Sequence, residues 1–201
     1  MKLGYLPCYV GKSIFPFDLI FDESLRIDDP IKVMECDAIV LWGGEDIASR
    51  YYGEDPHPMN QNSSGKPSAR DAHEWSAMCV AQNAGVPIIG VCRGAQFLTA
   101  FAGGTLNQHM AETGHHRPHM VETYDGKVYQ SSSCHHQAML PAGTNHEVLA
   151  KHKDGTMEVV YYPKVKGLAI QGHPEWMEYK DLFVEWCMRE IKARVLTPAT
   201  V

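Results

Sequence analysis

A cysteine that stands between two glycines is the strongest chemical signal in the sequence. Gly90, Cys92 and Gly94 form a G-x-C-x-G pattern, which follows an apolar run over residues 86–91 and precedes a predicted helix. This arrangement is the thiol form of a nucleophile elbow, a sharp turn that lifts a nucleophile above the carboxyl edge of a sheet. Glycines remove Cβ atoms that would block the turn, and the positive end of the next helix favours thiolate over thiol. The pattern predicts a nucleophilic Cys92; a core cysteine beside two turn glycines is the alternative.

A histidine and a glutamate two residues apart follow a later strand candidate, residues 168–171. A thiol nucleophile needs a base within reach and a carboxylate that orients this base. His173 and Glu175 could meet both needs at a strand end, and Pro174 stiffens the link between them. On its own the tripeptide could be an ordinary loop. Its position after the elbow in chain order makes it the candidate base and orienting group.

Two further glycines, Gly43 and Gly44, end the strand candidate at residues 38–42. They offer a bare backbone N–H at the same edge of the sheet as the elbow. Together with the N–H of Arg93 this group could form an oxyanion hole. A plain turn is the alternative.

The sequence contains 11 histidines, which raises the question of a metal site. A tight group is formed by His115, His116 and His119, with His109 and Glu112 upstream and His135 and His136 downstream. Such a group can ligate a metal. However, its spacing matches no familiar metal motif, and Arg117 would place a positive charge inside it. We therefore interpret this region as a His-rich surface loop and expect no metal.

The elements that must position these residues follow from hydrophobic periodicity. Strands are predicted at residues 3–6, 38–42, 86–91, 119–124, 148–150, 158–162 and 168–171, with a weaker candidate at 17–21. Helices are predicted at residues 69–83, 95–102 and 181–195, and a long polar loop at 51–67. Strands that alternate with helices indicate an α/β fold with a mostly parallel central sheet that is covered on both faces. We expect a single domain over residues 1–201.

Composition argues against several classes of protein. The formal net charge is −6 and the 18 basic residues are scattered, so no nucleic-acid-binding face is indicated. No apolar run approaches the ~20 residues that cross a bilayer, and the N-terminus lacks the apolar segment of a secretory signal. The six cysteines contain no C-x-x-C pair; they are Cys8, Cys36, Cys79, Cys92, Cys134 and Cys187. Free thiols in a reducing compartment are the default, and we expect a cytoplasmic protein.

Six ordered sequence blocks carry a resemblance to a known family. The blocks are GGEDI from Gly43, RD from Arg70 with Glu74, GVCRGAQ from Gly90, GGTLNQ from Gly103, SCHHQ from Ser133 and QGHPE from Gln171. The chain resembles class I glutamine amidotransferases, most closely the γ-glutamyl-γ-aminobutyrate hydrolase branch, peptidase family C26. The likeness extends from about residue 36 to residue 186.

The resemblance implies a flavodoxin-like three-layer sandwich and cleavage of a γ-glutamyl amide through a thioester. It assigns Cys92 as nucleophile, His173 as base and then acid, and Glu175 as the group that orients the histidine. It further implies an oxyanion hole from the backbone N–H groups of Gly44 and Arg93. The glutamyl group would be held by Gln96 and by the segment that contains Ser133, Cys134 and His135. No cofactor and no metal are implied.

Three positions depart from the pattern of that branch. Ser49 replaces a frequent proline, Ser132 a frequent asparagine and Gly172 a frequent aromatic residue. The last two border the expected glutamyl pocket, so they bear on substrate preference rather than on chemistry. The part that precedes Gly43 is short for the family, which suggests a trimmed βα unit.

Three functions remain open at this point. The chain could be a glutaminase subunit that passes ammonia to a synthetase or ligase partner. The sequence contains no P-loop, the nucleotide-binding motif of many ATP-dependent enzymes, so the chain could not use the ammonia itself. It could be a stand-alone hydrolase of γ-glutamyl amines or peptides. A non-catalytic binding protein on the same fold is the third reading.

Overall fold

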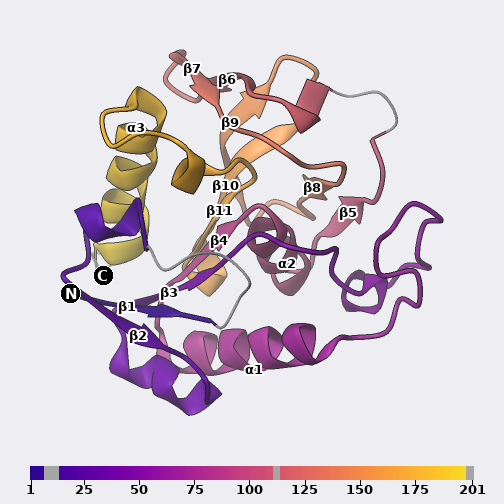
Figure 1. Ribbon diagram of the computed structural model, residues 1–201, viewed down its shortest axis with the longest axis horizontal. Coiled ribbons are helices and arrows are strands. Elements are labelled where there is room, and N and C mark those ends of the chain that lie inside the picture. Colours follow the sequence, from indigo (N-terminus) through magenta and orange to yellow (C-terminus); the bar gives the residue numbers. More distant parts are fainter. Residues whose placement is uncertain (7–13, 111–113, 198–201) are drawn as a thin grey trace.

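The computed structural model describes residues 1–6, 14–110 and 114–197 (Figure 1). Cys8 and Glu112 therefore lie outside the described residues. A large mixed sheet runs through the molecule in the order β2-β1-β3-β4-β11-β10-β9-β6-β7. The first five of these strands are parallel; they are β2 (Glu23–Arg26), β1 (Lys2–Tyr5), β3 (Ala38–Leu41), β4 (Ile88–Val91) and β11 (Gly167–Ile170).

The other part of the sheet is antiparallel. It contains β10 (Met157–Tyr162), β9 (Glu147–His152), β6 (His119–Thr123) and β7 (Val128–Ser131). Two short strands, β5 (Thr105–Asn107) and β8 (Ala138–Leu140), pair with each other, and β8 also pairs with β10. The segment after β7 reaches the loops that follow β11 and β3, because Ser132 accepts from the N–H of His173 and His136 contacts Asp46.

Helices cover both faces of the sheet. On one face, α1 (Ala69–Ala84) and α2 (Arg93–Phe101) share a buried core with β3 and β4. On the other face, α3 (Leu182–Glu190) continues into a π-helical turn, Ile191–Leu196, and packs on the same strands. Figure 1 shows α1 and α3 on opposite sides of the central strands. The predicted three-layer α/β fold is confirmed.

Local sequence signals set the ends of α1. The Ser68 side chain accepts from the N–H of Asp71, and the Asp71 side chain accepts from the N–H of Ser68, which completes a capping box. At the other end Gly85 adopts φ 70°, the left-handed conformation that commonly ends a helix. The Asp181 side chain caps α3 in the same way, because it accepts from the N–H of Phe183.

The predicted strand at 17–21 is wrong. These residues contain a 3₁₀ helix, Phe17–Leu19, and the three buried side chains are Phe17, Ile20 and Phe21. This spacing of three and four places apolar residues on one side of a helical turn, whereas a strand would alternate. The other 3₁₀ helices among the described residues are Pro30–Glu35, Ser49–Tyr52, Gly114–His116, Pro163–Val165 and Pro174–Trp176.

Four strands had no counterpart in the prediction, namely β2, β5, β7 and β8. The strands β2 and β7 form the two edges of the sheet and are mostly exposed, so they lack an apolar pattern. The predicted long loop is confirmed over residues 53–67, which contain no helix or strand, whereas Tyr51 and Tyr52 end a 3₁₀ helix. None of the helices in the described ranges is long and apolar enough to cross a membrane.

Candidate active site

Cys92 lies in a strained turn between β4 and α2. Its backbone adopts φ 51° and ψ −108°, a conformation that is rare for a residue with a side chain. The turn is tied to its surroundings on both sides. The N–H of Cys92 donates to the carbonyl of Ile170 in β11 over 2.8 Å, and its carbonyl accepts from the N–H of Gln96 over 3.1 Å. This geometry is that of a nucleophile elbow.

The two flanking glycines are required by close backbone contacts. A Cβ atom at Gly94 would lie 2.2 Å from the carbonyl oxygen of Leu41 in β3. A Cβ atom at Gly90 would lie 2.5 Å from the carbonyl oxygen of Gly94. Both distances are far below van der Waals contact and involve backbone atoms, which cannot rotate away. The helix α2 can therefore approach the sheet only because both positions are glycine.

His173 follows β11 and carries its own orienting carboxylate. The distance from His173 Nδ1 to Glu175 Oε1 is 2.7 Å. The indole of Trp176 stacks on the imidazole with ring centroids 3.6 Å apart and planes within 4° of parallel. The backbone of His173 is held as well, because its N–H donates to the carbonyl of Ser132 over 3.0 Å. These contacts fix the plane of the imidazole ring and leave Nε2 for another partner.

Cys92, His173 and the end of β3 meet at one point. A Cβ atom at Gly43 would lie 3.0 Å from His173 Cε1 and 3.6 Å from Cys92 Cβ. Burial lowers the pKa of His173, but its interactions with Cys92 and Glu175 outweigh burial and raise the pKa to about 10. The protonated imidazole is therefore stabilised by two acidic neighbours. The structure thus brings the three residues of the expected triad together.

Gly44 lies beside this point with an unusual backbone. Its φ of +147° favours glycine, and a Cβ atom there would lie 2.2 Å from an Arg70 guanidinium nitrogen. Arg70 donates to the carbonyls of Trp42 and Gly43, both over 3.0 Å. In a trans peptide the N–H points opposite to the carbonyl, so the N–H of Gly44 points away from Arg70. That direction suits an oxyanion donor.

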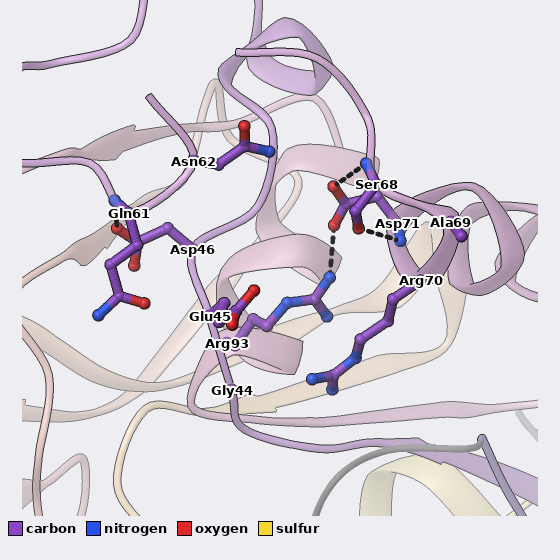
Figure 2. A pocket seen from close by; sticks show the side chains of 10 residues that line it. All are labelled: Gly44, Glu45, Asp46, Gln61, Asn62, Ser68, Ala69, Arg70, Asp71 and Arg93. Carbon is purple, nitrogen blue, oxygen red and sulfur yellow. Dashed lines mark hydrogen bonds and ion pairs between the residues drawn. The ribbon is translucent and has the colours of Figure 1, made fainter. Parts of the chain in front are cut away.

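A buried ion-pair network supports this corner of the site. The Arg93 side chain contacts the carboxylates of Asp71 and Glu74, and all three are almost fully buried. Arg70 Nε also reaches Glu74, over 2.8 Å. Figure 2 shows Arg93 extending toward Asp71 at the start of α1. Because both carboxylates hold the Arg93 side chain, the backbone that follows Cys92 is fixed in place.

A cavity of about 900 Å³ opens beside this network (Figure 2). Its lining combines the start of α1 with the loop after β3, and consists of Gly44, Glu45, Asp46, Gln61, Asn62, Ser68, Ala69, Arg70, Asp71 and Arg93. The two expected oxyanion residues, Gly44 and Arg93, thus share its wall. Cys92 and His173 do not line it. The cavity therefore lies beside the residue that follows Cys92, and Cys92 itself is not part of its wall.

The expected glutamyl-binding residues are placed unevenly. Gln96 lies one turn after Cys92 in α2, and its side chain donates to the carbonyl of Gln137 over 3.3 Å. The side chains of Ser133 and His135 are engaged inside the protein, because Ser133 donates to the carbonyl of His115 and His135 bonds the carbonyl of Gln137. Cys134 is exposed. In residues 133–135 it is therefore mainly the backbone N–H and carbonyl groups that are available to bind a ligand.

The interpretation of the His-rich region as a surface loop is wrong for three of its residues. His115, His119 and His135 are buried, whereas His116 and Arg117 are exposed. Residues 116–118 are all exposed between the buried His115 and His119, so the Arg117 side chain is not inside the cluster. All three buried imidazoles face Glu158 in β10.

The family of the chain follows from comparison with known proteins. Residues 26–175 match the family model described as Peptidase C26. This match includes Gly44, Cys92 and Glu175. The chain belongs to the peptidase C26 family. The expected family is thereby confirmed.

Relatives of this peptidase C26 protein have names in the glutamine amidotransferase class. A Mycobacterium tuberculosis protein named "Putative glutamine amidotransferase" is 34% identical over 157 residues, which are 69% of this chain and 50% of that protein. A Lactococcus lactis protein named "Putative glutamine amidotransferase-like protein YvdE" is 32% identical over 158 residues, which are 69% of this chain and 66% of that protein. The chain thus spans about half to two thirds of the length of these relatives.

Solved structures share the fold at low sequence identity. A Thermoplasma acidophilum protein described as a "putative gmp synthase subunit a" has a TM-score of 0.64 at 16% identity, over 96% of this chain and 98% of that chain. A Thermotoga maritima glutamine amidotransferase has a TM-score of 0.62 at 15% identity, over 98% and 86%. The chain therefore has the glutamine amidotransferase type of α/β fold.

Several residues of this peptidase C26 site escaped sequence reasoning. Trp176 stacks on His173, and its only signal was its position three residues after the histidine. The Asp46 carboxylate contacts His136 over 3.1 Å and so joins the loop after β3 to the segment after β7. Glu158 is buried among apolar residues of β10, and an acid inside an apolar strand pattern was the signal that could have revealed it.

Proposed function

We propose that this peptidase C26 protein hydrolyses a γ-glutamyl amide, either glutamine or a γ-glutamyl amine, through a thioester on Cys92. One observation carries the proposal: a cysteine in a strained elbow lies beside a histidine that is hydrogen-bonded to a carboxylate. This is the arrangement that nucleophilic acyl transfer requires. The names of the relatives in the glutamine amidotransferase class support the same reaction type.

The first half of the proposed reaction forms the thioester. Because the pKa of His173 is raised, the resting site holds a protonated imidazole beside the Cys92 sulfur. The thiolate attacks the γ-carbonyl carbon, and the carbonyl electrons move to the oxygen, which the N–H groups of Gly44 and Arg93 would stabilise. Collapse then breaks the C–N bond. His173 gives its proton to the departing nitrogen, so ammonia or an amine leaves.

The second half hydrolyses the thioester. His173 is now neutral, and its Nε2 takes a proton from water while Glu175 holds Nδ1. The resulting hydroxide attacks the thioester carbon and the C–S bond breaks. Glutamate leaves, and the thiolate and the protonated His173 are restored. Gln96 and the backbone at residues 133–135 would hold the glutamyl amino and carboxylate groups.

A second candidate is a glutaminase subunit that delivers ammonia to a synthetase. Two observations favour this second candidate. The structure described as a "putative gmp synthase subunit a" shares the fold over nearly the whole of both chains. The carbamoyl phosphate synthase small chain of Pyrobaculum aerophilum is 30% identical over 91 residues, which are 44% of this chain. Both candidates use the same thioester chemistry and differ in the fate of the leaving group.

The first prediction concerns Cys92. Release of ammonia or amine by the purified protein should be measured with L-glutamine and with a series of γ-glutamyl amines. We expect Cys92→Ala to lower kcat/KM by about 10⁴-fold or more, because the nucleophile and its base act as one unit. Cys79→Ala, which changes a partly buried cysteine in α1, is the matched control and should retain activity.

The substrate series separates the two candidates. Turnover of a γ-glutamyl amine well above glutamine indicates a stand-alone hydrolase. Low turnover of every substrate, together with covalent labelling of Cys92 by a glutamine-mimicking electrophile, indicates a glutaminase that needs a synthetase. The proposal fails if Cys92→Ala keeps near-normal activity, or if the protein neither turns over these substrates nor labels at Cys92.

A further inference from the structure

Four buried side chains converge in the antiparallel part of the sheet, away from Cys92 in the sequence. They are His115 in a 3₁₀ helix, His119 at the start of β6, His135 after β7 and Glu158 in β10. Their exposed fractions range from 0% for His115 to 9% for His119. One potential ligand atom from each lies within 4.8 Å of the others. Four separate segments of the chain thus present donor atoms to one small volume.

One oxygen of Glu158 is the centre of the group. Its Oε1 lies 3.1 Å from His119 Nε2, 3.4 Å from His115 Nδ1 and 3.9 Å from His135 Nε2. Glu158 itself is only 1% exposed. A carboxylate at this depth is strongly disfavoured unless positive charge or hydrogen-bond donors compensate it.

The outer nitrogen of each imidazole is already engaged. His135 Nδ1 lies 2.8 Å from the carbonyl of Gln137, and His119 Nδ1 lies 3.3 Å from the carbonyl of Arg117. A carbonyl only accepts, so both rings carry hydrogen on Nδ1. His115 Nε2 lies 3.0 Å from the Asp154 carboxylate, which holds hydrogen on that nitrogen. In their neutral forms all three rings therefore turn a bare nitrogen lone pair inward.

The inner atoms lack hydrogen-bond partners among the described residues. This holds for the inner nitrogens of His115, His119 and His135, and for both carboxylate oxygens of Glu158. A proton on one imidazole ring would let that ring donate a hydrogen bond to Glu158. A single carboxylate cannot, however, pair with three imidazoles that all lie close to the same one of its oxygens. A cation that accepts lone pairs from all four groups would satisfy every member at once.

We propose that His115, His119, His135 and Glu158 bind one divalent transition-metal ion, with Zn²⁺ as the best match. Three imidazole nitrogens and one carboxylate oxygen form a donor set that suits Zn²⁺. Four protein ligands close a tetrahedral sphere, which is typical of a structural site. The hydrogen bonds from the outer nitrogens are the supporting contacts that histidine ligands of metals usually have.

The ion would hold the segment at 132–137 against β10. This segment contacts the candidate active site twice, because Ser132 accepts from the N–H of His173 and Gln137 accepts from Gln96. The site is thus a positioning device for the segment at 132–137, which borders Gln96 and His173. It takes no part in the acyl transfer, and it stands independently of the proposed function.

Zinc binding by metal-free protein tests the proposal. Cys92→Ala serves as the background, since the thiol is a rival zinc ligand. Protein dialysed against a chelator is titrated with Zn²⁺, and with Co²⁺ to record the visible spectrum. We expect about one ion per chain, a Co²⁺ spectrum of four-coordinate type and a higher melting temperature with zinc. Adding His119→Asn and Glu158→Gln should abolish all three effects.

Two histidine controls separate this site from other histidines. His116→Ala changes an exposed histidine in the same turn, and His109→Asn changes a second group in which His109 contacts His136. Both should keep the stoichiometry and the spectrum. Zinc that survives in the double variant, or that is lost in His109→Asn, overturns the assignment. The assignment is also overturned if the Cys92→Ala protein itself binds neither Zn²⁺ nor Co²⁺. This outcome does not depend on whether the other variants fold, and it would mean that protons rather than a metal ion hold the cluster together.

Discussion

The charge on His173 depends on two acidic neighbours and on burial. Burial opposes the imidazolium form, but Cys92 and Glu175 outweigh burial and raise the pKa of His173 to about 10, against 6.5 for a free histidine. The Trp176 indole covers one face of the ring and keeps it aligned. At neutral pH the proposed base is therefore already protonated before substrate arrives, so in the proposed reaction it would act first as the acid for the leaving amine.

This charge can be measured directly by NMR titration of the His173 ring protons. We expect a midpoint well above 6.5 in the wild type and a lower one in Cys92→Ala, which removes one acidic partner. Because the folded pKa is raised, the stabilisation is fully present below about pH 6.5 and is lost as the pH rises toward about 10. A wild-type midpoint at or below 6.5 would refute the ion pair.

At the scale of elements, the proposed nucleophile Cys92 is positioned by the contact between α2 and the sheet. The turn at Cys92 holds φ 51° because its N–H is bonded to β11 and because α2 packs directly against β3 at Gly94. Strain of this kind persists only where surrounding contacts determine the backbone. The position of the sulfur is thus a property of β4, α2 and their neighbours together.

Gly94→Ala tests this contact. A Cβ atom 2.2 Å from the Leu41 carbonyl oxygen forces α2 away from β3, so we expect a loss of at least about 3 kcal/mol in the free energy of unfolding. Gly126→Ala is the control, because a Cβ atom there meets nothing within 4 Å. Only the backbone conformation, φ 75°, disfavours alanine at this position, and it should cost about 1 kcal/mol in the free energy of unfolding. Urea unfolding of both variants provides the comparison. Equal losses would mean that the close contact is unimportant.

At the scale of the whole molecule, the central strands lie between two apolar cores. One core joins α1 and α2 to the sheet, and the other joins α3 to the opposite face. The largest fully buried side chain is Trp186 of α3. Charged and polar groups gather at the carboxyl ends of the parallel strands, where both the elbow and His173 lie, while both faces of these central parallel strands stay apolar. The apolar cores thus stabilise the fold, while the candidate active site lies at the ends of the strands.

Two tryptophans close in sequence should therefore differ in effect. Trp186→Ala empties part of a core and should cost about 3–5 kcal/mol in the free energy of unfolding. Trp176 is 56% exposed, so Trp176→Ala should cost no more than about 1 kcal/mol, while it lowers activity by freeing the His173 ring. Denaturant unfolding and kcat/KM measure the two effects. A reversed order of stabilities would show that the core is wrongly assigned.

Local rules in the sequence accounted for the scaffold of the site. The glycines around Cys92, the capping box at Ser68 and the stop at Gly85 each act within a few residues, so their consequences could be derived without the rest of the chain. The same holds for His173 and Glu175, whose side chains meet because only one residue separates them. The order of strands and helices was sufficient to predict the α/β class.

Tertiary structure decided what depends on distant partners. The edge strands β2 and β7 carry no apolar pattern, since pairing with a neighbour and not burial makes them strands. His115 and Glu158 are ordinary residues in sequence, and only the antiparallel part of the sheet brings them together in the interior. Arg93 likewise meets Asp71 only when α1 lies beside the elbow. Burial and charge pairing are long-range properties, because water is excluded only by segments that are remote in the chain.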